Sequence, residues 1–470
     1  MRADTGMAQH ASAVALDDES LNLLTASVER YGRDKYSFEA RKALLGRAPG
    51  FSLAAWRDYS EMGWLAAHVP VDAGGFGGDP RAIAALMRYV GEHLVLEPVF
   101  ATVVLCGGVL AACNRAAART RLTALAAGGR LYALAHAESL GDGMDGRVDA
   151  VVCDGCLTGR KVMVLHGDVA DELLVSAHMG ASDAIALYAL DTSHAGVRRT
   201  SLRLLDGRGA ASFSFDAVPV TLLSASHSHP APMSNHVQAS SHTPVSNEIP
   251  AALAAVADAM ELLQAALDHA RLALCAEAHG AMRALNRDTL AYLKMRRQFG
   301  KPIGTNQVLQ HRMTELYMLE QESAAVISAA QRALMGSASS AAQDNATALI
   351  PRTRRAISGA VAHCLFAGRQ IAHEAVQMHG GIGITDELAV SHYFKRIMVL
   401  NQLLGDRDAH LDAFAAADAA CVAAAVGHAA GATGATDVAG VTSVTSVTSV
   451  TSVTSVTGVT AVTNPAPTHA

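Results

Sequence analysis

The chain has 470 residues, of which half are hydrophobic and 17% are charged, and its formal net charge is −6 at pH 7. This composition excludes a mainly disordered chain, and it excludes a general nucleic-acid binder because that role needs a clustered basic surface. The longest apolar stretches, such as residues 419–426, fall far short of the roughly 18 residues that span a membrane, and the N-terminus lacks an apolar signal core. We expect a compact cytoplasmic protein, and the seven dispersed cysteines indicate reduced thiols rather than a disulfide framework.

The first layer of the chain is predicted to be helical. After a disordered N-terminus at residues 1–19, apolar side chains recur at helical spacing between residues 20 and 130, as Leu21, Leu24 and Val28 do. This region is the predicted N-terminal α domain.

A middle β domain is predicted for residues 131–223. Short β-branched runs at residues 148–153, 161–165, 172–177 and 184–190 alternate there with Asp-Gly and Gly-rich turns. Within this domain Cys153-Asp-Gly-Cys156 has the form of a hairpin turn, and no second CxxC or CxxH completes a zinc site. We expect the two cysteines to face each other across the turn.

The linker at residues 224–249 is rich in Ser, His and Pro and separates the β domain from further helices. Its four histidines (His227, His229, His236 and His242) could bind a metal, but no carboxylate or Cys among them fixes a geometry, so a solvated loop is our interpretation. Residues 250–420 are predicted to form a C-terminal helical domain. Residues 421–470 form a low-complexity tail whose Val-Thr-Ser repeat predicts disorder and an aggregation hazard.

Two segments of the C-terminal domain carry candidate chemistry: residues 292–311, YLKMRRQFGKPIGTNQVLQH, and residues 377–386, QMHGGIGITD. In the first, Arg296 supplies a planar cation suited to phosphate, Phe299 an aromatic face and Gln307 an amide. In the second, the glycines let a backbone approach a ligand closely. A negatively charged, partly aromatic ligand would fit.

Together, these segments resemble the acyl-CoA dehydrogenase family, and in particular bacterial dehydrogenases of the pimeloyl-CoA type known as small subunits. The runs that carry the resemblance are YLKMRRQFGKPIGTNQVLQHR, MHGGIG and HYFKR, and less sharply YSFEARKALL, GGFGG, LVLEPVFATVVL, AHAE and VLHGD. The resemblance covers roughly residues 20–412. It implies an α+β fold of the acyl-CoA dehydrogenase type, with an N-terminal helical domain, a middle β domain and a C-terminal four-helix bundle that binds FAD, followed by a disordered tail.

The resemblance also implies FAD bound at a subunit interface, and therefore at least a dimer. By position, Arg296 and Gln298 look like the residues that hold the FAD diphosphate of the neighbouring subunit. The other implied cofactor contacts are Phe299 and Gln307, and near the adenine end Gln377, Gly380 and Gly381.

In the family, a Glu removes the α-proton of an acyl-CoA thioester and the flavin accepts the β-hydride, giving a 2-enoyl-CoA. The implied partners are the acyl-CoA substrate, with Asp268 and Arg271 as substrate-binding candidates, and an electron-transfer flavoprotein as electron acceptor. The two positions that usually carry the base hold Leu404 and Ala270 here, and neither side chain can accept a proton. The catalytic residue is therefore unknown.

Several hypotheses follow from the missing base. The match could be shifted by a residue or two, which would make Asp406 or Asp268 the base. The chain could bind FAD while a partner subunit brings the base, which is the reading we favour, or it could catalyse a changed reaction, as a flavin monooxygenase or nitroalkane-oxidase relative does. It could be a homomeric dehydrogenase with a base still to be identified. A rival of a different class is an FAD-stabilised, non-catalytic structural subunit.

The middle domain departs from the family pattern at the flavin. Met163 and Leu165 stand where the family often has an aromatic and a hydroxyl residue, and Ala137-Glu138-Ser139 replaces a Thr-Glu-Pro run. Met163 would still cover a ring with apolar surface, whereas Leu165 loses a hydrogen bond to the flavin.

Overall fold

The computed structural model describes residues 16–113, 115–139, 147–182, 184–225, 259–340 and 346–432. The Val-Thr-Ser repeat and the four linker histidines lie outside these described residues. Helix extends into both terminal segments that the sequence places outside the folded domains, because α1 begins at Asp18 and α11 continues to Ala432.

The N-terminal part is helical, and its first four α-helices begin at side-chain caps. Asp17 accepts a hydrogen bond from the backbone N of Ser20 at 2.7 Å, and Asp79 caps the helix that opens with Pro80. The elements are α1 (Asp18–Lys35), α2 (Phe38–Leu44), α3 (Leu53–Glu61), η1 (Trp64–Ala66), η2 (Val71–Ala73), α4 (Pro80–Glu92), the π-helix η3 (Val99–Cys106), α5 (Gly107–Ala112) and α6 (Ala116–Ala126).

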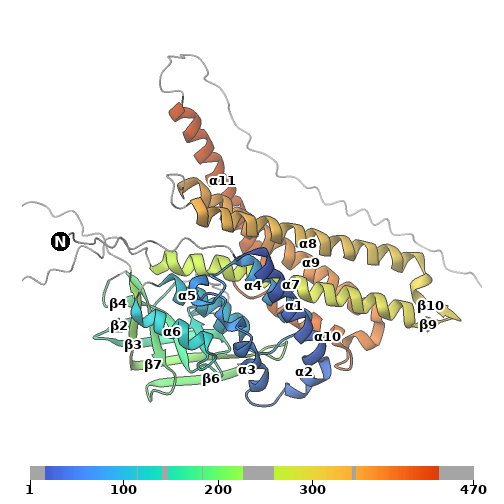
Figure 1. Cartoon of the computed structure of the whole chain (residues 1–470), viewed down its shortest axis with the longest axis horizontal. Helices are drawn as coiled ribbons and strands as arrows, with labels where there is room; N and C mark the ends of the chain where they lie inside the picture. Colours follow the sequence, from blue (N-terminus) through green and yellow to red (C-terminus); the bar gives the residue numbers. More distant parts are fainter. Residues whose placement is uncertain are drawn as a thin grey trace, which may run out of the picture. The chain divides into compact units, whose positions relative to one another are not determined.

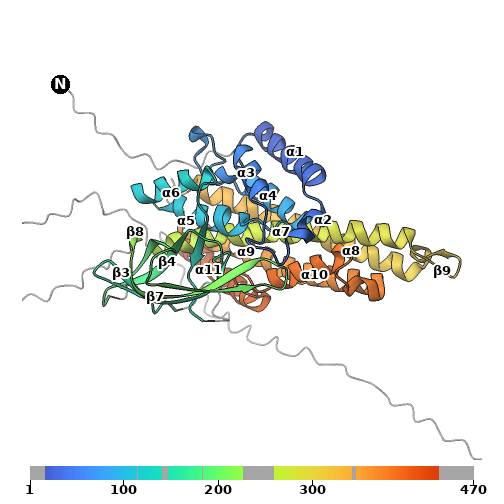
Figure 2. The ribbon, with the colours of Figure 1, turned by 90° about the horizontal axis from the view of Figure 1, so that it is seen from below.

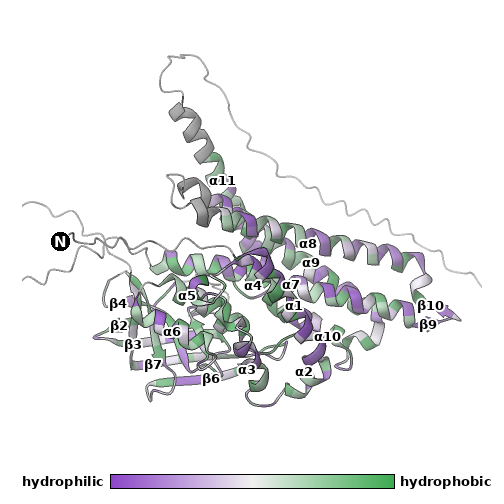
Figure 3. Ribbon diagram, viewed as in Figure 1, coloured by the Kyte–Doolittle hydropathy of each residue, from purple (hydrophilic) through white to green (hydrophobic). Residues whose placement is uncertain are grey.

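The middle part is an eight-stranded sheet in the order β6-β7-β3-β2-β4-β5-β8, with β1 also paired to β4. The strands are β1 (Tyr132–Ala135), β2 (Val151–Cys153), β3 (Cys156–Leu165), β4 (Glu172–Met179), β5 (Ile185–Asp191), β6 (Val197–Arg203), β7 (Gly209–Pro219) and β8 (Thr221–Ala225). Four of them match the predicted runs. The other four were not predicted from the sequence. β6, for example, carries polar residues along most of its length and is coloured hydrophilic in Figure 3.

The predicted cysteine hairpin is confirmed. Cys153 and Cys156 are directly opposed in the antiparallel β2–β3 pair, and Asp154 and Gly155 between them have φ of 50° and 75°. Two successive positive φ values are those of a type I′ turn, which suits the twist of a hairpin.

The C-terminal part consists of long helices that run together toward a small hairpin (Figures 1 and 2). Its elements are α7 (Ala259–Met295), β9 (Arg297–Gln298), β10 (Lys301–Pro302), η5 (Ile303–Thr305), α8 (Gln307–Ser340), α9 (Ala346–His379), η6 (Gly380–Ile384), α10 (Ala389–Leu400) and α11 (Arg407–Ala432). The helical, β, helical order predicted from the sequence is the order observed.

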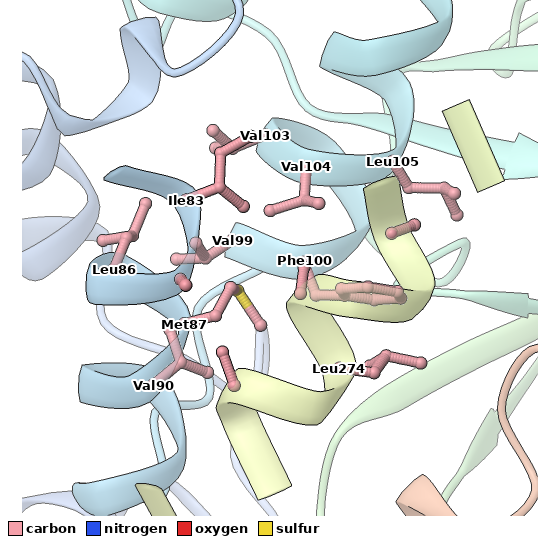
Figure 4. Close-up of a cluster of buried hydrophobic side chains, with 14 of the residues drawn as sticks. Ile83, Leu86, Met87, Val90, Val99, Phe100, Val103, Val104, Leu105 and Leu274 are labelled. Carbon is pink, nitrogen blue, oxygen red and sulfur yellow. The ribbon is translucent and has the colours of Figure 1, made fainter. Parts of the chain in front are cut away.

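The main hydrophobic core lies where α4 and η3 meet α7, and Figure 4 shows Met87, Phe100 and Leu274 among its side chains. α4 and α7 approach closely at two glycines. A Cβ at Gly91 would lie 1.8 Å from the carbonyl O of Glu277, and one at Gly280 would lie 2.1 Å from that of Arg88. Any larger residue at either position would therefore push the two helices apart.

A buried charge cluster joins all three parts of the chain. The Arg396 side chain on α10 is inaccessible, and its Nη1 donates to Glu277 Oε1 on α7 at 2.6 Å while its Nε lies 2.9 Å from Asp206 Oδ2 after β6. Arg208 pairs with both carboxylates, and Arg41 on α2 donates to the Asp206 carbonyl O. Burial alone would raise the pKa of Asp206, but the Arg208 and Arg396 charges outweigh it and lower that pKa, so the carboxylate stays ionised.

Candidate cofactor site and catalytic positions

The hairpin that follows α7 presents the predicted phosphate-binding segment to solvent. Gln298 pairs with Lys301, and the two turn residues, Phe299 and Gly300, have φ of 49° and 81°. The Phe299 side chain is fully exposed, at 100%. Exposing a whole aromatic ring costs hydrophobic free energy, so a surface outside this chain is the natural partner of the ring.

The second predicted segment ends α9 and lies beside the first. The rings of Tyr292 and His379 stack with centroids 4.3 Å apart, and the Tyr292 hydroxyl donates to the His379 carbonyl O at 3.3 Å. Burial lowers the pKa of His379, which favours the neutral ring in this stack. The structure thus brings together two segments that are about 80 residues apart in the chain.

Seven residues are the sequence-predicted cofactor contacts, and all of them are exposed around this end of α7, α8 and α9: Arg296, Gln298, Phe299, Gln307, Gln377, Gly380 and Gly381. Within the described residues, no polar side chain of this set makes a hydrogen bond or ion pair. A Cβ built at Gly380 or Gly381 would meet no atom within 4 Å, so the backbone is open to an approaching group. Unpartnered amide and guanidinium groups beside an open backbone and an exposed aromatic ring fit a dinucleotide cofactor such as FAD.

The residues at the two family base positions are apolar in the structure. Leu404 follows α10, is 8% exposed and has a φ of 58°, a conformation that L-residues other than Asn and Asp seldom adopt. Ala270 is inaccessible in the core of α7. Neither residue offers a group that accepts a proton.

The two aspartates of the shifted-match hypothesis have other roles. Asp406 is exposed and caps α11, since its Oδ1 accepts from the Ala409 N at 2.9 Å. Asp268 is separated from Ala270 by about 200° around α7, so the two side chains leave opposite sides of the helix. A carboxylate at residue 268 therefore points to a different side of α7 from a side chain at residue 270.

Asp268 and Arg271 instead line a cavity of about 370 Å³ between α7, α9 and α11, and Leu404 contributes to the same wall. Asp268 Oδ1 accepts from Arg271 Nη1 at 3.1 Å, and its Oδ2 lies 3.6 Å from Arg354 Nε. Both oxygens of the Asp268 carboxylate therefore face guanidinium groups, one of Arg271 and one of Arg354. Sequence reasoning missed Arg354 and the neighbouring His410, because neither stands in a recognisable motif.

The β-domain residues near the expected flavin position are arranged for packing more than for hydrogen bonding. Met163 is 41% exposed, while Leu165 is buried. Glu138, in the replaced Thr-Glu-Pro run, is held by the buried Lys161, whose Nζ donates to its Oε1 at 2.6 Å. Burial lowers the pKa of Lys161, and the Glu138 charge opposes that effect.

The described residues contain neither a cluster of metal ligands nor a membrane-spanning helix. In that part of the chain no three His, Cys, Asp or Glu residues gather as metal ligands would. No described helix combines the length and apolar character that crossing a membrane requires.

Comparison with known proteins gives consistent results. Residues 260–417 match the family model described as the acyl-CoA dehydrogenase C-terminal domain. A curated relative from Mycolicibacterium smegmatis, acyl-CoA dehydrogenase IpdE2, is 28% identical over 82% of this chain and 95% of its own length. Its Mycobacterium tuberculosis counterpart is 36% identical over 29% of this chain and 37% of its own length.

Solved structures show the same fold. A variant of the Tcur3481-Tcur3483 steroid ACAD has a TM-score of 0.69 at 24% identity, covering 86% of this chain and 99% of that one. The ChsE4-ChsE5 complex from Mycobacterium tuberculosis has a TM-score of 0.66 at 20% identity, covering 84% of this chain and 96% of that one. At this identity the likeness establishes the fold, which agrees with the α+β architecture expected from the sequence.

Proposed function

Because the chain belongs to the acyl-CoA dehydrogenase family, we propose that it is an FAD-binding subunit of a heteromeric dehydrogenase that converts an acyl-CoA thioester to the 2-enoyl-CoA. One observation carries the proposal. An exposed, unpartnered set of cofactor-type side chains occurs in a chain with apolar residues at both family base positions.

The exposed end of α7, α8 and α9 would hold the cofactor of a neighbouring subunit. Arg296 would bind the diphosphate, with Gln298 as a second donor, because a guanidinium forms paired charge-assisted hydrogen bonds to phosphate oxygens. Phe299, wholly exposed in this chain, would be covered by the cofactor and the neighbouring subunit. Dimerisation would then bury the ring and complete the site in one step.

The base would come from the partner subunit. Dehydrogenation removes an α-proton, which a carboxylate must accept, and a β-hydride, which bound FAD would accept. Leu404 and Ala270 cannot take the proton. Of the aspartates two residues from them in the chain, Asp268 is paired with arginines and Asp406 caps α11. In this proposal Asp268 and Arg271 contact the substrate without catalysing proton transfer.

Two structures of the same fold support a heteromer, since one is the ChsE4-ChsE5 complex and the other is the Tcur3481-Tcur3483 steroid ACAD. An electron-transfer flavoprotein remains the proposed electron acceptor. The non-catalytic structural subunit is the second candidate function, and the apolar base positions favour it as well. The two differ in whether this chain contributes residues to a working site.

The test is the FAD content and mass of the full chain, purified alone and with the dehydrogenase subunit that copurifies with it. The proposal expects an oligomer with bound FAD, and loss of substrate-dependent flavin reduction in the complex when Arg296 is replaced. A complex whose activity does not depend on Arg296 would favour the structural subunit. The proposal would be overturned if the protein were colourless and could not take up FAD, both when purified alone and when purified with its partner subunit.

A further inference from the structure

Two cysteines of the middle domain have no role in the proposed dehydrogenase reaction. Cys153 ends β2, Cys156 begins β3, and a two-residue turn separates them. They are directly opposed in the antiparallel pair, so their side chains leave the same face of the sheet. The backbone of the hairpin therefore holds the two thiols next to each other.

Both thiols can be reached from solvent. Cys153 is exposed and Cys156 is partly exposed, although cysteine is among the residue types that are most often fully buried. Val152 and Leu157, the next residues inward on the two strands, point to the opposite face and are buried. The hairpin thus turns its apolar side chains into the core and its thiols toward the accessible face.

A buried pair of cysteines offers a contrast. Cys275 on α7 and Cys364 on α9 share a side-chain hydrogen bond, and this bond together with burial raises the pKa of Cys275 well above its ordinary value. A protonated, shielded thiol is a poor nucleophile because the thiolate is the reactive form. Cys153 and Cys156 combine proximity with access.

The spacing of directly opposed residues is close to that of a disulfide. Their Cα atoms lie about 4.5–5.5 Å apart in antiparallel strands, and a disulfide joins Cα atoms about 4.4–6.8 Å apart. The Cβ atoms lie about 4.5–5.5 Å apart before the bond forms and about 3.5–4.5 Å apart afterwards. Closing the bond therefore draws the two side chains together by about 1 Å.

The end of the hairpin has room for this movement. β4 pairs with the first two residues of β2 and leaves Cys153 outside its register, while Cys156 lies opposite Pro219, which has no N–H to donate. The turn itself is open, since a Cβ at Gly155 would meet no atom within 4 Å. A disulfide closed here would be accessible and slightly distorted, and disulfides of that kind are reduced more easily than structural ones.

We propose that Cys153 and Cys156 form a reversible redox site, which a low-molecular-weight disulfide converts from a dithiol to an intramolecular disulfide. The more accessible Cys153 thiolate attacks one sulfur of the small disulfide, forms a mixed disulfide and releases one thiolate. The Cys156 thiolate then attacks the Cys153 sulfur, closes the bond and releases the second thiolate. The protein gives up two electrons and two protons, and the small disulfide takes them up as two thiols.

The hairpin is remote from the predicted cofactor contacts. In both Figure 1 and Figure 2, β3 lies at the left of the described fold and β9 at the right. The redox state of the two cysteines can therefore be measured whether or not the chain holds flavin. The outcome does not depend on the proposed function.

The test uses the full chain, because trypsin cleaves after Arg147 and Arg160 and releases residues 148–160 as a peptide with both thiols and no other cysteine. The chain is equilibrated with mixtures of reduced and oxidised glutathione, quenched with acid, unfolded, alkylated and digested for mass spectrometry. In oxidising mixtures we expect this peptide to lose two hydrogen atoms and both alkylation sites, and reduced glutathione should restore them. Cys275 and Cys364 should be alkylated throughout.

Two variants separate the steps of the exchange. Cys156→Ser removes the second thiol, so the mixed disulfide of Cys153 with glutathione should accumulate about tenfold or more above its level in the unsubstituted chain, where a neighbouring thiol acts at high effective concentration. Cys421→Ser removes a partly exposed cysteine of α11 and is the matched control. Its peptide 148–160 should behave as in the unsubstituted chain.

Three results would overturn the proposal. Two free thiols in peptide 148–160 at the most oxidising ratio would show that the pair does not close. Glutathione retained on Cys153 in the unsubstituted chain would show that Cys156 does not complete the exchange. A disulfide that forms but persists in excess reduced glutathione would be a structural bond instead of a reversible redox site.

Discussion

Tyr292 stacks on His379, with ring centroids 4.3 Å apart, and this contact brings the two segments that carry the cofactor prediction to the same end of the helical bundle. Tyr292 lies in the last turn of α7, which Arg296 directly follows, and His379 directly precedes Gly380 and Gly381. The stack therefore links the segment of the guanidinium that we propose to bind phosphate to the open glycine backbone.

Replacing Tyr292 tests this role. Tyr292→Ala should lower the free energy of unfolding by about 2–4 kcal/mol, because it removes a partly buried ring and its stacking contact with His379, and it should weaken FAD binding as well. Tyr292→Phe keeps the stack and loses only a 3.3 Å hydrogen bond, so we expect a loss below about 1 kcal/mol. Urea unfolding followed by circular dichroism measures both. Unchanged FAD affinity in Tyr292→Ala would show that the stack does not position the site.

Arg296→Ala should reduce FAD affinity about tenfold or more while leaving the fold intact, since the side chain is exposed and has no partner within the described residues. Arg332→Ala, an exposed arginine elsewhere on α8, is the control and should retain full affinity. Flavin fluorescence titration gives both values. Equal affinities of the two variants would remove Arg296 from the cofactor site.

Removing a single charged side chain from the buried charge cluster should lower the free energy of unfolding. Glu277→Ala leaves Arg396 and Arg208 without a carboxylate that both now share, so we expect a loss of about 3–5 kcal/mol in the free energy of unfolding. The double substitution Glu277→Leu with Arg396→Met should lose less than the sum of the two single changes. A double-mutant cycle by urea unfolding tests the coupling, and simple additivity would contradict it.

The free energy of unfolding should decrease as the pH drops from about 6.5 toward 4. Burial lowers the pKa of His68 and of His166 to about 3, and that of His279 to about 4. Because these folded-state pKa values lie below the unfolded value of 6.5, the unfolded chain binds more protons in this window, and protonation favours unfolding. Urea midpoints measured across this range should decline, and the decline should be shallower in His166→Gln. A flat profile between pH 6.5 and 4.5 would contradict the burial of neutral histidines.

The sequence predicts the order of the three parts and the hairpin between Cys153 and Cys156 well, because helical periodicity and Asp-Gly turns are local signals. It misses β6 and β7 because polar and small residues dilute the β-branched pattern on an exposed face. The predicted cofactor residues cannot be assigned partners from sequence. Only the fold shows that Gln377 shares a groove with Arg312 and Phe394, which come from two other helices.

The identity of the catalytic base is also not determined by the sequence alone. The sequence reveals that Leu404 and Ala270 are apolar, but it leaves Asp268 and Asp406 open as replacements. The structure adds the surroundings of both aspartates: Asp268 projects away from the side of Ala270 and pairs with two arginines, and Asp406 accepts from the Ala409 N. Such distinctions depend on the direction in which each side chain points. Sequence spacing predicts that direction only once the boundaries of the helix are known.

The most direct measurement is an anaerobic titration of the FAD-loaded full chain, without partner, with a panel of acyl-CoA thioesters, following the absorption of oxidised flavin. The account predicts that the flavin stays oxidised with every thioester and is reduced once the copurifying dehydrogenase subunit is added. Reduction of the flavin in the isolated chain would show that this chain carries its own base and would contradict the account.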